Sequence, residues 1–294
     1  MEFGVRTGEC TAGQTVLSAA ARPRAMTDRI LETAGLAGHR AALVDATDGS
    51  VTAWPRFART VRLAACGLAH RGLADGDTAG VLVQDAASAA IAVNAIRAAG
   101  AAVCLIDADA GPAELATRLN ACGARLLITS APLAGLAAEG ADRSRVRQVI
   151  AFGEAPGTTP FSSLLSFADG STADEWATDE SGRPQEGNGL AGQHVLAPEG
   201  DEGPVSAPPA GDETGPGGGR QLTYRDVVVA APPRGDGQAY TSLLDLTLLT
   251  GATLVAAPVT LVTAAMRVYQ GTAAIVPSGT RVPGIAPELV FPVA

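Results

Sequence analysis

The chain of 294 residues carries a formal net charge of −9 at pH 7, and 47% of its residues are hydrophobic although only 4% are aromatic. This length is enough for one large domain or two modest ones with a sizeable core. The negative charge argues against nucleic acid or an anionic membrane surface as partner, because both need a basic face. No apolar run approaches the length of a membrane span.

All 21 basic residues are Arg, so chemistry that needs a Lys, such as a Schiff base or a phosphate-loop lysine, is excluded. A GC-rich genome also favours Arg over Lys. The four cysteines have neither CxxC spacing nor His neighbours, so we expect no metal site. We interpret three of them as small buried hydrophobes, typical of a reducing cytoplasm: Cys66, Cys104 and Cys122.

The amino-terminal residues 1–25 contain three Arg and no continuous apolar core, so they do not form a secretory signal. We expect a flexible extension there, and an ordered part that begins near Met26. Thr27 or Asp28 could then cap a short helix.

Strands and helices alternate regularly from Ala41 onward. Apolar runs predict strands over 41–45, 51–52, 78–83, 101–106, 124–129 and 146–152. Amphipathic or capped stretches predict helices over 54–71, 88–99 and 111–122, and Asp85 complements the dipole of the second of these helices. This alternation is typical of an α/β fold with a parallel sheet covered on both faces.

The stretches ARTVRLAACGLAHRGLADGDTAGVLVQDAASAAIAVNAIRAAGAAVCLID (58–107) and PAELATRLNACGARLLIT (112–129) carry a resemblance to a known family. Their order, spacing and small residues resemble the amino-terminal part of the adenylate-forming superfamily, which contains acyl-CoA synthetases and nonribosomal adenylation domains. The resemblance implies layered parallel-sheet sub-lobes like the amino-terminal domain of acyl-CoA synthetases. None of the matching residues is catalytic in that family.

Composition changes after residue 155. Residues 156–193 are rich in Gly, Pro, Ser and acidic residues and cannot bury enough apolar area to fold, so we expect an acidic flexible linker. It would join a first sub-lobe, residues 26–155, to a second, residues 194–294. A short strand is possible at 193–197, around His194.

A glycine-rich loop at residues 211–219 precedes the motif Leu222-Thr223-Tyr224. It resembles the phosphate-binding loop of the family, in which backbone N–H groups and a Lys hold phosphate oxygens. Here Gly218 stands at the place of that Lys, and Asp212 and Glu213 replace small residues. The resemblance assigns an eroded phosphate contact to Thr214, Gly215, Gly217, Gly218 and Gly219; a solvated loop without ligand is the alternative.

Beyond the loop, we expect helices over 224–231, 240–249 and 264–269, strands over 251–255 and 272–276, and a Pro-interrupted tail over 277–294. The chain ends before the positions where the family carries its adenine-binding motif, its ribose-binding Asp and its mobile carboxy-terminal domain. The resemblance therefore implies roughly the first half of such an enzyme.

These features predict a degenerate adenylate-forming homologue without ATP-dependent ligase activity, acting as a binding or accessory protein in natural-product biosynthesis. The alternatives are an ATP-independent cyclase built on the ligase fold, or residual AMP or acyl-CoA binding. The catalytic candidates for a cyclase are polar residues near the eroded loop: Tyr224, Tyr240, His194 and Arg225.

We expect no cofactor beyond weak ATP or AMP binding. The expected partners are an acyl or polyketide-like small molecule and a second copy or another protein. Asp107 and Asp109 follow a strand end, where α/β proteins often bind ligands, although ordinary loop residues occupy this place in the family. No G-x-S-x-G elbow supports a hydrolase.

Overall fold

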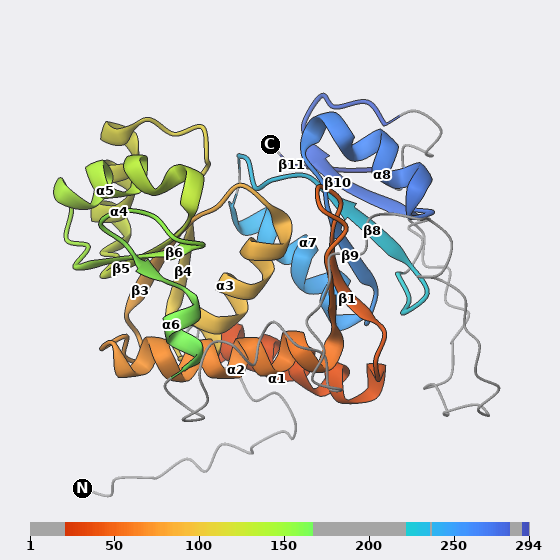
Figure 1. The fold of residues 1–294 in the computed structure, drawn as a ribbon, viewed down its shortest axis with the longest axis horizontal. Coiled ribbons are helices and arrows are strands. Elements are labelled where there is room, and N and C mark those ends of the chain that lie inside the picture. Colours follow the sequence, from red (N-terminus) through yellow and green to blue (C-terminus); the bar gives the residue numbers. More distant parts are fainter. Residues whose placement is uncertain (1–20, 167–221, 236, 283–289, 294) are drawn as a thin grey trace, which may run out of the picture.

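Two β-sheets organise the molecule, and the computed structural model describes residues 21–166, 222–235, 237–282 and 290–293 (Figure 1). The first sheet has the strand order β11-β10-β8-β9-β1-β2. Its neighbouring strands are parallel, apart from the antiparallel β1/β2 hairpin. In that order the strands are Val290–Val293, Ala273–Pro277, Val227–Ala230, Thr253–Ala256, Ala41–Asp45 and Val51–Ala53.

The second sheet is parallel throughout and has the order β4-β3-β5-β6-β7. Its strands are Ala102–Leu105, Thr78–Leu82, Leu126–Ser130, Gln148–Phe152 and Thr159–Pro160. Parallel neighbours need a crossover connection, and helices α3, α4 and α5 provide these crossovers.

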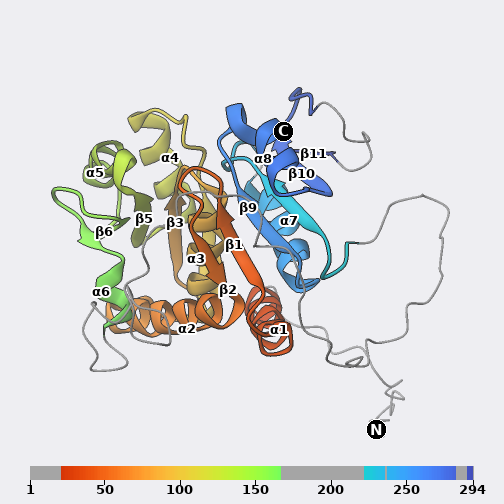
Figure 2. The same ribbon diagram turned by 45° about the vertical axis from the view of Figure 1, so that its right-hand side comes forward.

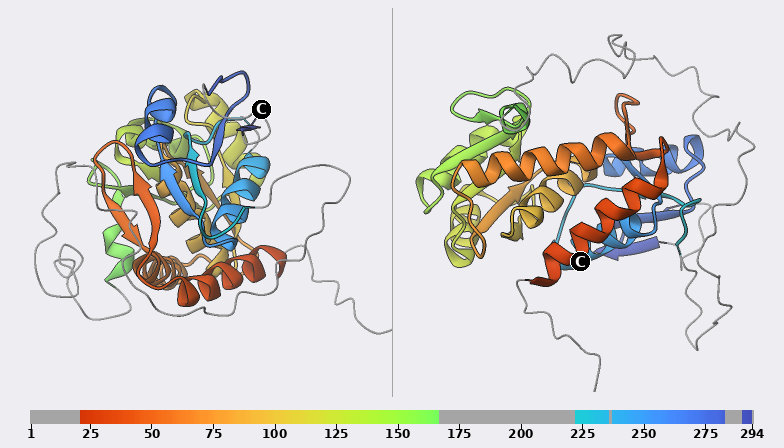
Figure 3. Two further views of the ribbon diagram at one scale, coloured as in Figure 1. Left: turned by 90° about the vertical axis from the view of Figure 1, so that its right-hand side faces the viewer. Right: turned by 90° about the horizontal axis from the view of Figure 1, so that it is seen from below.

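The helices separate and cover the sheets. Helices α3 (Ala86–Ala98) and α7 (Gly237–Leu249) lie between the two sheets in one large core (Figure 1). The outer face of the second sheet packs against α4 (Pro112–Cys122) and α5 (Ala134–Asp142), and that of the first packs against α8 (Val262–Val268). Helices α1 (Ala21–Ala37) and α2 (Trp54–His70) cross the amino-terminal ends of the strands (Figure 3, right). A one-turn helix, α6 (Ser162–Leu165), follows β7.

Local sequence explains the helix boundaries. Asp85 is the N-cap of α3, because its side chain accepts a hydrogen bond from the backbone N–H of Ser88 at 2.6 Å. Helix α4 ends at Cys122, and Gly123 is its C-cap, with a φ of 67° that favours glycine. The α/β fold predicted from the sequence is confirmed, as are the expected helices α2, α3, α4 and α7.

The helix expected over residues 224–231 is wrong, because strand β8 occupies residues 227–230 in the middle of the first sheet. Its Val-Val-Val-Ala sequence is buried at every position, and β-branched side chains favour a strand that is covered on both faces. The preceding residues form a turn in which an Asp226 carboxylate oxygen accepts hydrogen bonds from the Thr223 N–H at 2.6 Å and hydroxyl at 2.9 Å.

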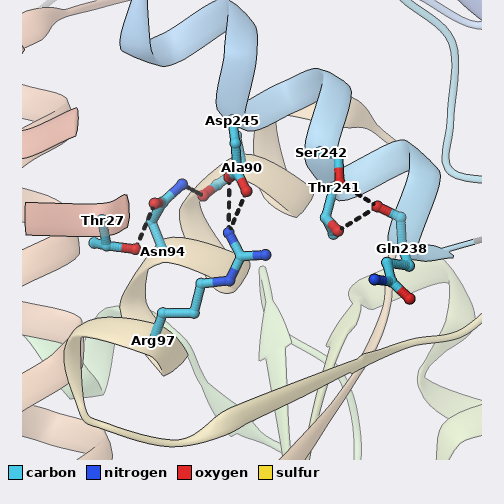
Figure 4. A network of polar contacts seen from close by, with 8 residues as sticks. All are labelled: Thr27, Ala90, Asn94, Arg97, Gln238, Thr241, Ser242 and Asp245. Atoms are coloured by element: carbon cyan, nitrogen blue, oxygen red, sulfur yellow. Dashed lines mark hydrogen bonds and ion pairs between the residues drawn. The ribbon is translucent and has the colours of Figure 1, made fainter. Parts of the chain in front are cut away.

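Two expectations at the ends of the described part also need correction. Helix α1 begins at Ala21, ahead of Met26, and Thr27 lies inside it instead of capping it. The Thr27 hydroxyl is buried and donates to the Asn94 side-chain oxygen on α3 at 2.9 Å (Figure 4). Within the tail expected at 277–294, residues 290–293 form strand β11 at the edge of the first sheet, where Pro292 is tolerated because an edge strand can lack one N–H donor.

The β1/β2 hairpin does not pair with the sheet formed by the strands that follow it in sequence. Strand β1 pairs in parallel with β9, so that Leu43 lies opposite Leu254 (Figure 2). The first sheet thus combines residues 41–53 with residues 227–293. None of the helices among the described residues is long and apolar enough to cross a membrane.

The cysteines differ in environment. Cys66 is exposed, so the expectation that it is a buried hydrophobe is wrong. Cys104 on β4 and Cys122 at the end of α4 are half-buried, their thiols interact with each other, and the Cys122 S–H donates to the Leu119 carbonyl at 3.5 Å. This contact raises the pKa of the Cys104 thiol and lowers the pKa of Cys122 to about 7, because the Cys104 S–H stabilises a Cys122 thiolate.

We therefore expect iodoacetamide to alkylate Cys122 faster than Cys104 at pH 7, since the thiolate is the reactive form. The rates are measured by mass spectrometry of peptides, with exposed Cys66 as an internal reference. In Cys104→Ala the labelling of Cys122 at pH 7 should slow. Equal rates at Cys104 and Cys122 would contradict this assignment.

An ion pair between α3 and α7 lies inside the central layer. One Arg97 nitrogen lies 2.7 Å from each carboxylate oxygen of Asp245, and the two side chains are 13% and 9% exposed (Figure 4). Burial raises the pKa of Asp245, and the Arg97 charge opposes this rise. Removing one partner would leave a poorly solvated charge behind.

We expect Arg97→Met to lower the free energy of unfolding by about 3–5 kcal/mol. The double variant Arg97→Met/Asp245→Leu should recover most of that loss, because it buries no unpaired charge. Urea unfolding, monitored by circular dichroism, measures the free energy of unfolding of both variants. As a control, Arg118→Met breaks an exposed pair with Glu114 on α4 and should cost less than about 0.5 kcal/mol. A double variant as unstable as Arg97→Met would contradict the assignment.

Candidate functional site

A cleft of about 440 Å³ lies where the carboxyl ends of strands from both sheets meet. In open α/β sheets, ligands bind beyond the carboxyl ends of the strands, and this volume suits a small molecule. The strand ends of β1, β3, β5, β6 and β9 supply its lining: Asp45, Thr47, Asp48, Gln84, Asp85, Ser88, Ser130, Ala131, Pro132, Phe152, Ala256, Ala257 and Pro258.

The hairpin β1/β2 supplies two carboxylates to the cleft. Asp45 is the last residue of β1, and its side chain accepts a hydrogen bond from the backbone N–H of Thr47 at 2.7 Å. Asp48 accepts one from the Ser50 N–H at 2.8 Å. These local bonds hold each carboxylate in the turn, because Asp side chains satisfy backbone donors two residues on.

The third carboxylate of the lining, Asp85, comes from the second sheet, between the end of β3 and the start of α3. The N-cap hydrogen bond to Ser88 holds it at the start of α3. The adjacent Gln84 N–H donates to the Ser130 hydroxyl at 3.1 Å, which ties the end of β3 to the end of β5. Burial raises the pKa of Asp85 and the Ser88 hydrogen bonds oppose this rise, while the charge of Asp45 raises the pKa further.

The remaining wall is apolar. Phe152 lines the cleft and stacks on Phe161, with ring centroids 4.1 Å apart and planes at 21°. Ala256, Ala257 and Pro258 cover the opposite side, where β9 ends. Such a wall can hold a hydrophobic group of a ligand while the carboxylates and hydroxyls orient its polar part.

The lining is strongly negative. Three of the thirteen residues that line the cleft are Asp, and none of these thirteen is Arg or His. In a partly dry cleft a carboxylate repels a ligand anion and attracts a ligand cation. Among the residues that the structure describes, no group of three or more His, Cys, Asp or Glu is placed to hold a metal ion.

Of the catalytic candidates taken from the sequence, the three that the structure describes, Tyr224, Arg225 and Tyr240, do not line this cleft. Tyr240 on α7 is 1% exposed, and its hydroxyl donates to the Ala231 carbonyl at 2.6 Å. Burial raises its pKa well above the ordinary value, and Asp85 adds to this rise. Its hydroxyl is therefore a neutral structural donor near the cleft, and its catalytic role stays a prediction.

Tyr224 and Arg225 lie at the opposite edge of the first sheet, before β8 begins. The exposed Tyr224 ring has the guanidinium carbons of Arg40 and Arg225 at 5.0 and 5.5 Å from its centroid, and Arg225 donates to its hydroxyl at 3.1 Å. The other predicted site residues lie outside the described part of the chain: His194, Thr214, Gly215, Gly217, Gly218 and Gly219.

Asp107 and Asp109 lie in the loop between β4 and α4, and this loop contacts the segment that precedes α7. The Asp107 carboxylate accepts a hydrogen bond from the Gly235 N–H at 3.1 Å, and Arg234 donates to Asp109 at 3.2 Å. These carboxylates therefore hold the segment before α7 against the segment after β4.

The sequence analysis missed most of the cleft, although a signal was present. A polar residue stands at or just after the carboxyl end of three strands: Asp45 ends β1, Ser130 ends β5, and Gln84 comes two residues after β3. Side chains at the carboxyl ends of parallel strands share one edge of a sheet. Their meeting across two sheets depended on the pairing of β1 with β9, which no local pattern reveals.

The raised pKa of Asp85 yields a stability prediction. Because its folded pKa lies above the unfolded value of 3.8, its charge costs stability at pH 7, and this cost disappears as the pH falls through the folded pKa. We expect Asp85→Asn, which keeps a good N-cap, to be more stable than the parent at pH 7 and to lose that advantage near pH 4. Asp85→Ala, without a cap, should be about 1 kcal/mol less stable than Asp85→Asn. Urea unfolding at both pH values measures this; an advantage that grows toward pH 4 would contradict it.

Solved structures share this fold at low sequence identity. A long-chain-fatty-acid-CoA ligase from Archaeoglobus fulgidus aligns with a TM-score of 0.61 and 16% identity over 86% of this chain and 51% of its own. An amide bond synthetase mutant from Marinactinospora thermotolerans gives 0.60 and 17% over 87% and 49%. A benzoate CoA ligase from Burkholderia xenovorans gives 0.59 and 15% over 90% and 52%. The chain thus spans about half the length of these structures.

No curated protein matches the sequence. The profile of one family, described as AMP-binding enzyme, matches residues 31–209. This match covers more than half of the chain, from within helix α1 to the border of the glycine-rich loop. It agrees with the parallel sheets, the helix order and the resemblance read from the sequence. The chain belongs to the AMP-binding enzyme family.

Proposed function

We propose that this protein does not activate carboxylates with ATP, and that it serves natural-product biosynthesis as a binding or accessory protein whose cleft holds an uncharged or cationic small molecule. The observation that carries the proposal is the cleft at the strand ends, with Asp45, Asp48 and Asp85 in its lining and no basic side chain among its lining residues. A polyketide-like ligand with an apolar body and polar tips suits the Phe152 wall and the hydroxyls of Ser88 and Ser130.

The electrostatics disfavour a nucleotide in this cleft. A single carboxylate facing a phosphate oxygen at about 4 Å costs between about 1 and 4 kcal/mol, depending on how far water screens the pair. A triphosphate multiplies this cost, and three carboxylates line the cleft. The residues of the described cleft therefore do not fit the nucleotide that the family name implies.

The glycine-rich loop supports the same proposal from the sequence. The loop resembles the phosphate loop of the family, but the whole chain contains no Lys, and Asp212 and Glu213 stand beside Thr214. Backbone N–H groups alone would have to bind the phosphates against two further negative charges. A role that needs no phosphate contact is consistent with this composition.

An ATP–pyrophosphate exchange assay tests the proposal. The purified protein, given MgATP and a panel of aryl, fatty and amino acids, should show no carboxylate-dependent exchange above the rate without protein. Carboxylate-dependent exchange would sink the proposal. If the protein instead converted a biosynthetic intermediate to product without ATP, it would belong to the cyclase-type enzymes.

The charge argument has its own test. The triple variant Asp45→Asn/Asp48→Asn/Asp85→Asn should bind AMP at least about tenfold more tightly than the parent, because roughly 1.4 kcal/mol of relieved repulsion corresponds to tenfold. Isothermal titration at low salt measures the affinities. Asp142→Asn, which removes an exposed charge at the end of α5, is the matched control and should change nothing. Equal AMP affinity in all three proteins would contradict the role of the carboxylates.

A further inference from the structure

A second pocket, of about 320 Å³, lies at the amino-terminal edge of the second sheet, on the side away from the acidic cleft. Six residues line it: Arg71, Gly72, Arg125, Leu126, Arg147 and Gln148. Three of the six are Arg and none is acidic. This composition stands out in a chain whose net charge is −9.

Secondary structure brings the three guanidinium groups together. Arg125 and Arg147 directly precede the adjacent parallel strands β5 and β6, and the Arg147 N–H donates to the Arg125 carbonyl at 2.9 Å. Arg71 follows helix α2 at the same edge. Its guanidinium donates to the Ser163 hydroxyl at 2.9 Å, and that hydroxyl donates to the Pro160 carbonyl at 2.7 Å. The α6 segment therefore orients Arg71.

One carboxylate next to the pocket partly compensates this charge. Asp77 lies 3.0 Å from an Arg125 nitrogen and also accepts the Ala74 N–H at 2.9 Å. The Ala74 N–H, Arg125 and Arg147 together lower the pKa of Asp77, so it is ionised at neutral pH. Asp77 pairs with Arg125, and the lining itself contains three Arg and no carboxylate.

We propose that this pocket binds a phosphoryl anion, such as pyrophosphate or the phosphate tip of a phosphomonoester. Guanidinium groups pair with phosphate oxygens through two parallel N–H donors, and three of them can surround one phosphoryl group. Leu126 is the one apolar side chain among the six lining residues, so the pocket offers no wall for a nucleobase or an acyl chain. The phosphoryl group itself is therefore the part that is recognised.

Isothermal titration at constant ionic strength tests the proposal. It measures the affinity of the protein for pyrophosphate, inorganic phosphate and glycerol 2-phosphate. We expect micromolar to sub-millimolar binding of at least one of them, and an affinity at least about tenfold lower in Arg147→Gln, since charge-assisted hydrogen bonds are lost. Tighter binding of pyrophosphate would indicate a free inorganic anion, and tighter binding of glycerol 2-phosphate a phosphorylated metabolite.

Two further variants keep this test independent of folding. Arg145→Gln removes an exposed Arg on the same loop that does not line the pocket, and should keep parental affinity within about twofold, because charges in water are screened. Asp77→Asn should bind the anion several-fold more tightly, because it removes the competing carboxylate next to Arg125. No binding by the parent at 10 mM ligand, equal affinity in Arg147→Gln, or weaker binding in Asp77→Asn would overturn the proposal.

Failure of this anion-site proposal can be distinguished from failure of the proposed function. Heat from MgATP that disappears in Arg147→Gln belongs to this pocket and leaves the absence of ligase activity untouched. Carboxylate-dependent pyrophosphate exchange would overturn the proposed function alone.

Discussion

The burial of helices α3 and α7 between two parallel sheets is the constraint on which the rest of the structure depends. Each helix must be apolar towards both sheets, and the small side chains of α3, mostly Ala, allow this close approach. A polar contact in such a layer has to be complete, since an unpaired charge would be costly. The two bonds from Arg97 to Asp245 meet this requirement and fix how the helices meet.

The same layer separates charges on the molecule. Parallel strands place all their carboxyl ends at one edge, where Asp45, Asp48 and Asp85 line the cleft. Their amino ends, at the other edge, carry Arg125 and Arg147. An anion and a cation would therefore be attracted to opposite ends of the molecule, and a strongly acidic chain can still offer a local anion site.

Much of the fold could be predicted from the sequence, because helix α2 and strands β3 to β6 have strong local patterns. Prediction failed where tertiary context decides: Val227–Ala230 forms a strand because two neighbouring strands bury it, although the residues before it resemble a loop that leads into a helix. Helix α5 escaped notice because its Ala and Gly residues give little periodic contrast. The candidate site was missed for a related reason, since its carboxylates come from separate parts of the chain.

The pairing of β1 with β9 has a consequence for biosynthesis on the ribosome. The Thr253 hydroxyl donates to the Ala41 carbonyl across 212 positions of sequence, and Leu43 lies opposite Leu254. Contacts so distant in sequence form late and slowly, because closing the intervening loop costs entropy before the contacts form. While residues 46–252 are being translated, the hairpin edge lacks its parallel neighbour and exposes apolar Leu43 and Val44. The unpaired edge of β1 is therefore a site at which the emerging chain can aggregate during this interval.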